Sequence, residues 1–168
     1  MRLAVVTTHP IQYNAPLFKL LAEMPEIELQ VFYTWGSEVL SAKFDPGFRR
    51  NVEWDIPLLE GYSYRFVENV AANKGSHHFS GINNPSLNSE ILKWKPDSLL
   101  IFGWSFRSHL SCIRYFHRKI PIYFRGDSTI LDDIDWLRKI FRKTYLSWVY
   151  KKVDYFLSVG ANNTSYFL

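Results

Sequence analysis

The sequence predicts an α/β domain built on one doubly wound parallel sheet, with helices on both faces in a three-layer α/β/α arrangement. Segments that pattern as strands alternate with segments that pattern as helices through most of the chain. The first strand-like segment, 3–6, is apolar on both faces, as in a central parallel strand. The chain has 168 residues, about one domain, and its hydrophobic content of 47% allows a real core.

The first third of the chain is expected to form two strands around one helix. After strand 3–6, Asn14 is expected to cap a helix whose first turn tolerates Pro16. Pro25 ends that helix, and the alternation over 27–33 predicts the second strand. The apolar stripe of the helix is expected at Leu17, Leu20, Leu21 and Met24.

The middle of the chain is less regular. Residues 35–61 hold several glycines and prolines and predict irregular structure, whereas 62–67 predicts a third strand. A polar loop over 69–84 follows, and Asn84 with Pro85 predicts a capped helix start. The inner face of that helix is expected at Leu87, Ile91 and Trp94.

The last third continues the alternation into a Rossmann-like sheet. The elements expected there are strand 98–102, helix 107–118, strand 121–124, helix 131–152, strand 155–159 and the start of a helix in 161–168. Because that last helix stops in its first turn, we expect the chain to be the N-terminal part of a longer protein. Ligands of such sheets bind at the carboxyl ends of the strands. The turns to examine are therefore 8–14, 103–106, 125–129 and 160–163.

The turn after the first strand contains no glycine. It lacks the G-x-G-x-x-G spacing that packs backbone around a pyrophosphate, which argues against a dinucleotide site. Side chains and the positive helix end remain, and they suit a polyhydroxylated or phosphorylated ligand. The candidate binding residues are His9, Gln12, Tyr13 and Asn14. The alternative is that Asn14 only caps the helix and that His9 and Tyr13 only pack.

Two further turns hold candidate residues. After the fifth strand, Arg125 suits phosphate or carboxylate, and Asp127 can orient a hydroxyl or accept its proton. The alternative is an internal Arg–Asp pair, with Ser128 or Thr129 capping the next helix. After the fourth strand, Gly103 permits close backbone approach, and Trp104 either stacks on a sugar or packs. Ser105 and Ser128 complete the candidate substrate contacts.

Composition narrows the class of protein. The single cysteine, Cys112, cannot form an internal disulfide, which fits a reducing compartment. No stretch resembles a signal peptide or approaches the roughly 20 apolar residues that span a bilayer. We therefore expect a soluble, cytoplasmic protein. His77 and His78 lack further ligands at zinc spacing, so no metal is expected. No RNA-binding signature occurs, so no nucleic acid partner is expected.

The segment 136–152 has six basic residues and no acidic one. Its apolar stripe is expected at Leu137, Ile140, Phe141, Tyr145, Trp148 and Val149. Arg138, Arg142 and Lys143 lie off this stripe. Two interpretations stay open: a core helix with a solvated basic face, or docking to anionic lipid head groups at the inner membrane.

Three stretches together resemble a known family. "VVTTHPIQYNAPLFKLLA", "FDPGFRRNVEWDIPLLEGYSYRFVEN" and "DYFLSVGANNTSYF" are similar to the N-terminal domain of family 4 glycosyltransferases of the GT-B fold. The likeness is greatest to a bacterial subgroup whose first turn reads His-Pro-Ile-Gln-Tyr. It covers essentially the whole chain.

The resemblance implies a retaining, metal-independent transferase with two Rossmann-like domains that face a cleft. Residues 1–168 would form the acceptor-side domain, which binds a glycan or lipid-linked acceptor for surface polysaccharide synthesis. The C-terminal domain, absent from this chain, would bind the nucleotide-sugar donor, which is a co-substrate, and no cofactor is implied. The isolated chain is therefore expected to be inactive.

The resemblance also implies roles for single residues. His9, Gln12 and Asn14 would hold the acceptor or the edge of the diphosphate. Asp127 would orient the acceptor hydroxyl, and Arg125 would neutralise phosphate or fix Asp127. The match has two departures: relatives often have glycine in the first turn, and a histidine where this chain has Arg125-Gly126-Asp127. The alternatives are a non-catalytic α/β module that binds a partner or membrane, and a flavodoxin-type nucleotide-binding domain.

Overall fold

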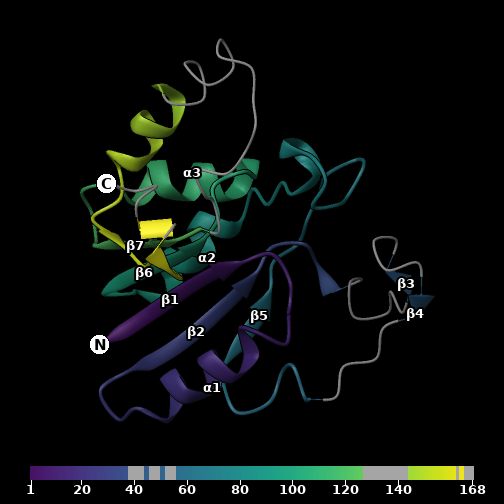
Figure 1. Ribbon diagram of the computed structural model, residues 1–168, viewed down its shortest axis with the longest axis vertical. Helices are drawn as coiled ribbons and strands as arrows, with labels where there is room; N and C mark the ends of the chain where they lie inside the picture. The colour runs from purple at the N-terminus through teal and green to yellow at the C-terminus, as the bar shows by residue number, and fades with distance from the viewer. Residues whose placement is uncertain (38–43, 46–49, 52–55, 127–143, 162, 165–168) are drawn as a thin grey trace.

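The computed structural model describes residues 1–37, 44–45, 50–51, 56–126, 144–161 and 163–164. Within them the chain forms an α/β domain on a six-stranded, all-parallel sheet, which confirms the predicted fold class (Figure 1). Several predicted site residues fall outside the described residues, so their roles stay predictions. They are Asp127, Ser128, Arg138, Arg142 and Lys143.

The strands lie in the order β5-β2-β1-β6-β7-β8. Counted along the six predicted strands this is the order 3-2-1-4-5-6 of the Rossmann fold, with the topological switch point between β1 and β6. Their bounds are Arg2–Thr7 for β1, Glu28–Tyr33 for β2, Tyr64–Phe66 for β5, Ser98–Phe102 for β6, Ile122–Arg125 for β7 and Tyr155–Phe156 for β8. The third and sixth strands are shorter than the sequence predicted.

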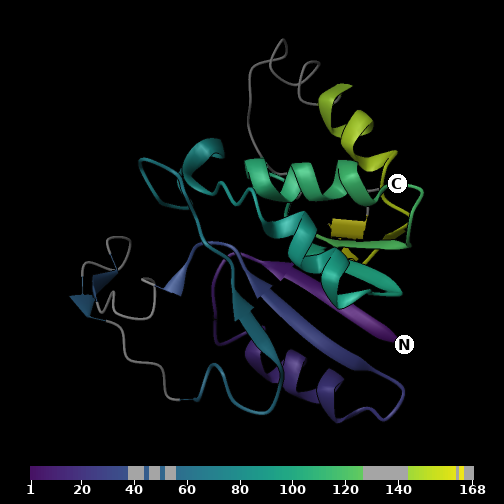
Figure 2. The ribbon, with the colours of Figure 1, turned by 180° about the vertical axis from the view of Figure 1, so that it is seen from behind.

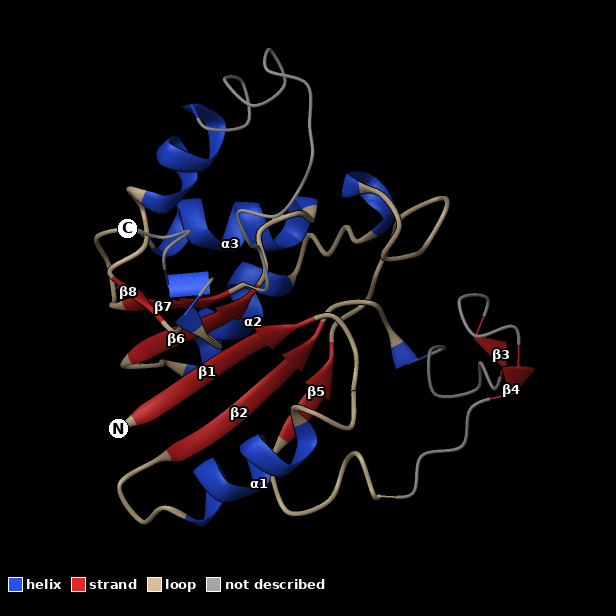
Figure 3. Ribbon diagram, viewed as in Figure 1, coloured by secondary structure: helices blue, strands red, loops and turns tan. Residues whose placement is uncertain are grey.

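The helices cover the two faces unequally (Figures 2 and 3). The first helix, α1 (Ala15–Glu23), covers one face, whereas α2 (Leu87–Trp94), α3 (Arg107–Phe116) and the helical residues 144–150 cover the other. Right-handed crossovers explain the division, because the chain steps from β1 to β2 in one direction and from β5 through β6 and β7 to β8 in the other. A short 3₁₀ turn, η2 (Phe79–Gly81), precedes α2.

Two hydrophobic clusters fill the layers. On the α1 side, Val5 and Val31 pack against Phe18, whereas Ala4 and Val6 face the cluster under α2 and α3. Alternate residues of β1 therefore enter different cores, because successive side chains of a strand point to opposite faces. This confirms the prediction that strand 3–6 is apolar on both sides.

The predicted apolar stripe of the first helix is wrong in part. Phe18 is fully buried at the centre of the contact, with Leu17 and Leu21 packed beside it. Leu20 and Met24 instead expose 58% and 46% of their surfaces. The helix is rotated so that Ala15 and Phe18 meet the sheet, because the aromatic ring fills more space than either of the exposed chains.

The predicted cap at Asn14 is confirmed in position only, and the predicted cap at Asn84 is wrong. Asn14 occupies the N-cap position of α1, but its side chain makes no cap hydrogen bond. The second predicted cap, Asn84, is buried elsewhere, and α2 begins later, at Leu87, with Ser86 at its N-cap position. Burial overrides the local capping preference of Asn84, since its side chain serves three carbonyl groups in the interior.

Two other predictions are corrected in part. The segment predicted as irregular contains a small antiparallel pair, β3 (Phe44–Asp45) and β4 (Arg50–Asn51). Of the predicted stripe in the last long helix, Val149 is buried, but Tyr145 and Trp148 are exposed. Leu146 takes the second buried position, so this helix presents aromatic rings outward.

No helix of the described residues is long and apolar enough to cross a membrane.

Phe18→Ala is expected to destabilise the protein by about 3–5 kcal/mol, because it removes a buried ring and leaves a cavity between α1 and the sheet. Leu20→Ala, at an exposed site of the same helix, is the matched control and is expected to change the free energy of unfolding by less than about 0.5 kcal/mol. Urea denaturation followed by circular dichroism measures both. Equal losses would contradict the observed orientation of α1.

Candidate functional site

The predicted site turns meet at one edge of the sheet. Strands β1, β6 and β7 are neighbours, and the register pairs Val6 with Ile101 and Phe102 with Arg125. The turn after β1, the turn after β6 and the end of β7 therefore lie side by side at the carboxyl edge (Figure 3). This edge flanks the topological switch point, where such sheets bind ligands.

The glycine-free turn after β1 is held by contacts with the end of β2. His9 Nδ1 lies 2.9 Å from the Thr8 hydroxyl, and the His9 ring meets Trp35 edge-on with centroids 4.9 Å apart. Trp35 in turn donates its backbone N–H to the Thr8 carbonyl at 2.8 Å. The Trp35 ring therefore holds the His9 ring, a contact that the sequence did not reveal.

The other residues of this turn differ in exposure. Tyr13 is 76% exposed and Gln12 is half-buried. Asn14 is only 6% exposed, yet its carboxamide makes no hydrogen bond to any described residue. An amide without a partner among these residues can bind a ligand hydroxyl or phosphate. The packing alternative for Tyr13 is excluded by its exposure.

The turn after β6 is shaped by a glycine. Gly103 has a φ of +75°, which side-chain-bearing residues rarely adopt, and its N–H donates to the Arg125 carbonyl at 2.8 Å. A Cβ added there would meet nothing within 4 Å, so the space beside it is open. Trp104 packs against the core and meets the Tyr145 ring at 5.5 Å, which favours packing over sugar stacking. Ser105 is exposed.

Arg125 presents a cation on the α1 side of the same edge. Its half-buried side chain places the guanidinium 5.3 Å from the centre of the Phe102 ring. Phe102 meets Phe18 of α1 edge-on at 5.7 Å. The guanidinium thus lies on the face covered by α1, the helix that the glycine-free turn begins. A cation held there suits an anionic ligand.

Asn84 forms a buried hub beneath this edge that sequence reasoning missed. Its Nδ2 donates to the carbonyls of Thr34 at 2.9 Å, Val67 at 3.1 Å and Glu68 at 2.9 Å. Its backbone N–H donates to the Ser108 hydroxyl at 2.6 Å. Through its side chain and its backbone N–H, Asn84 thereby joins the ends of β2 and β5 to the start of α3. An asparagine before proline in a polar loop gives no signal of this role.

His109 is a second buried group that sequence reasoning missed. It is fully buried in α3, and its Nδ1 donates to the carbonyls of Phe102 at 3.0 Å and Gly103 at 3.2 Å. Since carbonyl oxygens only accept, the proton of the neutral ring lies on Nδ1, which leaves Nε2 as an acceptor 2.9 Å from the Thr34 hydroxyl. The single proton of that hydroxyl is shared with a second acceptor, the Thr7 carbonyl at 3.1 Å. The signal that could have indicated its burial is its helical spacing with the apolar residues Cys112, Ile113 and Phe116, which places it on the inner face of α3.

Burial governs the charge of His109. Desolvation lowers its pKa from 6.5 to about 4, against the opposing effect of its bonds to the Gly103 and Phe102 carbonyls. The ring is therefore neutral near pH 7 and serves as a junction between β6, β2 and α3. A neutral, completely enclosed imidazole has no path to a substrate, so its role is to position the edge.

A third asparagine, Asn69, holds together the polar loop over residues 69–84. Asn69 is 2% exposed, and its side chain bonds the Trp35 and Gly81 carbonyls at 3.2 and 2.9 Å and the N–H of Ala71 and Asn83 at 3.1 and 2.9 Å. Since Trp35 also contacts His9, the loop and the glycine-free turn share one support.

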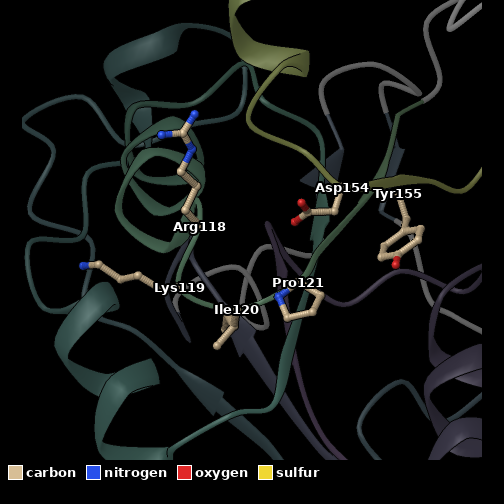
Figure 4. Close-up of a pocket in the computed structure, with 6 residues that line it drawn as sticks. All are labelled: Arg118, Lys119, Ile120, Pro121, Asp154 and Tyr155. Carbon is tan, nitrogen blue, oxygen red and sulfur yellow. The ribbon is translucent and has the colours of Figure 1, made fainter.

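A hollow of about 280 Å³ lies at the opposite edge, beside the amino ends of β7 and β8 (Figure 4). It is lined by Arg118, Lys119, Ile120, Pro121, Asp154 and Tyr155. Parallel strands place this hollow at the far end of the sheet from the candidate site. No group of three His, Cys, Asp or Glu side chains that could hold a metal ion occurs in the part of the chain that the structure describes.

His109 predicts a pH dependence of stability. Its folded-state pKa, about 4, lies below the unfolded value of 6.5, so the unfolded chain binds more protons between these values. The free energy of unfolding is expected to fall by about 3 kcal/mol as the pH drops from 6.5 to 4, and to be unaffected by this group above pH 7. Urea denaturation at pH 7, 5.5 and 4.5 measures it. The His109→Gln variant should lack this component, and His77→Gln, at an exposed site, should keep it. Identical pH profiles for His109→Gln and wild type would refute the assignment.

Asn84→Asp is expected to lower the free energy of unfolding by several kcal/mol, because a carboxylate cannot donate to the three carbonyls and would place buried charge against them. Asn73→Asp, in the exposed part of the same loop, makes the same chemical change without these bonds. Thermal unfolding compares the two. A melting temperature of Asn84→Asp close to that of the control would rule out the hub.

Comparison with known proteins leaves the family open. No protein-family model matches the chain, and no curated protein matches it. The likeness of the three stretches to family 4 glycosyltransferases therefore rests on the residues themselves.

Proposed function

We propose that this chain is the acceptor-side domain of a retaining, metal-independent glycosyltransferase. The observation that carries the proposal is the glycine-free turn at the topological switch point of a Rossmann-like sheet. Phosphate-cradling turns at this place use glycine so that backbone can approach the ligand. Here the turn offers polar side chains in place of glycine, and they suit hydroxyl groups and one or two negative charges.

Each residue of the turn has chemistry that fits a sugar acceptor. Asn14 is 6% exposed, its side chain makes no hydrogen bond to the described residues, and an amide can both donate to and accept from a hydroxyl. His9 is fixed against Trp35, and Tyr13 is exposed at the rim. Gln12, which lies between these two residues in the sequence, is half-buried. Groups that are held before the ligand arrives lower the entropic cost of orienting it.

Arg125 and Asp127 complete the proposed chemistry. The Arg125 guanidinium is positioned over Phe102 at the carboxyl edge, where it would neutralise phosphate of a nucleotide-sugar donor held by a second domain. Asp127 follows two residues later and would orient the acceptor hydroxyl. The leaving phosphate of the donor would itself take the hydroxyl proton, so no general base of this chain is required. Ser105 and Ser128 are proposed as further acceptor contacts.

The cellular setting follows from the same proposal. The acceptor would be a glycan or a lipid-linked sugar of a bacterial surface polysaccharide, made at the cytoplasmic side of the inner membrane. Docking of Arg138, Arg142 and Lys143 on anionic lipid stays part of this proposal, and these residues lie outside the described ones. Trp104 is a weaker contact than expected, because its ring packs against Tyr145.

The test is transfer of label from a panel of sugar nucleotides to bacterial glycan and lipid fractions by the protein that carries this domain. Asp127→Ala is expected to lower kcat/KM at least ~100-fold, the scale on which loss of correct substrate positioning slows a reaction. Lys93→Gln, exposed on α2, is the control and should retain activity. Near-normal activity of Asp127→Ala, or a collapse of its melting temperature, would make Asp127 structural. Absence of transfer across the panel would favour a non-catalytic module.

A further inference from the structure

The turn that follows β8 contains a buried polar side chain. Residues 157–161 and 164 are exposed, whereas Asn163 exposes only 2% of its surface. The turn includes residues 160–163, one of the four strand-end turns where the sequence places function, and the proposed function does not use it. A carboxamide buried in an otherwise exposed turn takes its hydrogen-bond partners from the interior. For Asn163 these partners are backbone groups that follow β7 and β8.

The parallel ladder between β7 and β8 shows how these backbone groups would otherwise bond. Phe124 pairs with Phe156, and Leu157 donates its N–H to the Phe124 carbonyl at 2.8 Å. Along a parallel pair, the carbonyls that bond the same neighbour recur every second residue on each strand. The next bond of this ladder would therefore join the Val159 N–H to the Gly126 carbonyl.

The Asn163 carboxamide takes the place of that bond. Val159 donates its N–H to Asn163 Oδ1 at 3.1 Å, and Asn163 Nδ2 donates to the Gly126 carbonyl at 2.9 Å. One amide group therefore lies between the two backbone groups and satisfies both. Strands joined through an inserted amide are farther apart at that point than strands that bond directly. Asn163 thus separates the carboxyl ends of β7 and β8 while both backbone groups keep a partner.

Closure of the turn itself is provided by Thr164. Its hydroxyl lies 2.8 Å from the Ser158 hydroxyl and 3.0 Å from the Gly160 carbonyl, and its N–H donates to the same carbonyl at 2.9 Å. These bonds join residues at most six positions apart, whereas the bond from Asn163 to Gly126 spans 37 positions. The long bond therefore does more than close the turn, since it ties the turn to the end of β7.

Three consecutive carbonyls at the end of β7 have fixed partners. The Phe124 carbonyl accepts from β8, the Arg125 carbonyl accepts the Gly103 N–H at 2.8 Å, and the Gly126 carbonyl accepts from Asn163. Of these three bonds, the one from Asn163 is made by a side chain. Since glycine permits many backbone conformations, the residue after Arg125 depends on this bond for a fixed orientation.

We propose that Asn163 is a positioning residue that holds the turn after β7 away from β8 and so orients the Arg125 side chain. The Arg125 guanidinium lies 5.3 Å from the centre of the Phe102 ring, and Gly126 follows it directly. A shift of the Gly126 carbonyl toward β8 would therefore carry Arg125 with it. The inference rests on the proposed function only for the anion that Arg125 neutralises, because the placement of the turn follows from the hydrogen bonds alone.

The first test is made in solution by NMR. Scalar coupling across a hydrogen bond connects an amide nitrogen with the carbonyl carbon of its acceptor. In the wild-type protein, the Val159 nitrogen is expected to couple to the side-chain carbonyl of Asn163. In Asn163→Ala the strands can bond directly, so the coupling should move to the Gly126 carbonyl. The signals of the Arg125 side chain, which lie in the field of the Phe102 ring, should change at the same time.

Two further variants separate the contributions. Asn163→Asp keeps the shape and the acceptor for the Val159 N–H but cannot donate to Gly126. It should change the Arg125 signals and leave the coupling of Val159 to residue 163. The matched control is Thr164→Val, which removes the local side-chain bonds of the same turn and should leave both readouts as in wild type. Melting temperatures report folding, and if Asn163→Ala does not fold, Asn163→Asp decides.

Sugar transfer tests the link between Asn163 and Arg125. Asn163→Ala is expected to lower kcat/KM about 10- to 100-fold, because a misplacement of about 1 Å can cost about 100-fold. If Asn163 acts through Arg125, Arg125→Gln/Asn163→Ala should be no slower than Arg125→Gln alone. Thr164→Val should retain activity.

Three results would overturn the proposal. They are coupling of Val159 to the Gly126 carbonyl in wild type, unchanged Arg125 signals in both Asn163 variants, and kinetic losses of the two single variants that multiply in the double variant. Absence of transfer by wild type would instead count against the proposed function, and the NMR measurements alone would then decide the role of Asn163.

Discussion

Several carbonyl groups at the carboxyl ends of β2, β5 and β6 lie beyond the hydrogen bonds between the strands. They are inside the protein, where water cannot reach them. Asn84 supplies two N–H groups to three of these carbonyls, and His109 supplies one N–H to two others. A buried carbonyl without a donor costs about 1–3 kcal/mol, so the strand ends keep their positions only while these donors are present. The Thr34 carbonyl bonds Asn84 and the Thr34 hydroxyl bonds His109, which joins the two halves of the sheet.

The candidate site depends on this junction through a short chain of contacts. Thr34 and Trp35 donate their backbone N–H groups to the Thr8 carbonyl, which fixes the path of the turn after β1. Trp35 then supports the His9 ring, and Asn69 holds the Trp35 carbonyl from the other side. The turn can omit glycine because neighbouring segments shape it. Side chains consequently occupy the place that backbone takes in a phosphate-binding turn.

The doubly wound topology separates two kinds of surface. Strand ends and their turns form the carboxyl edge, where the proposed transfer chemistry lies. The helices return antiparallel to the strands, so the C-terminal half of α3 and Lys152 lie toward the amino edge. The hollow beside the amino ends of β7 and β8 is therefore separate from the turns of the carboxyl edge.

Local patterns in the sequence determined the type and order of most elements, the two-faced core of β1 and the turns where function should be sought. These features follow from side-chain periodicity and from turn residues within a few positions of each other. Tertiary structure decided that Phe18 rather than Leu20 meets the sheet, because only the facing layer shows which side chain fills the gap. It also decided the roles of Asn84 and His109. Their partners lie up to 75 residues away in the chain. Which carbonyl groups need a donor is decided only when the strands pair, so local sequence preferences do not indicate these roles.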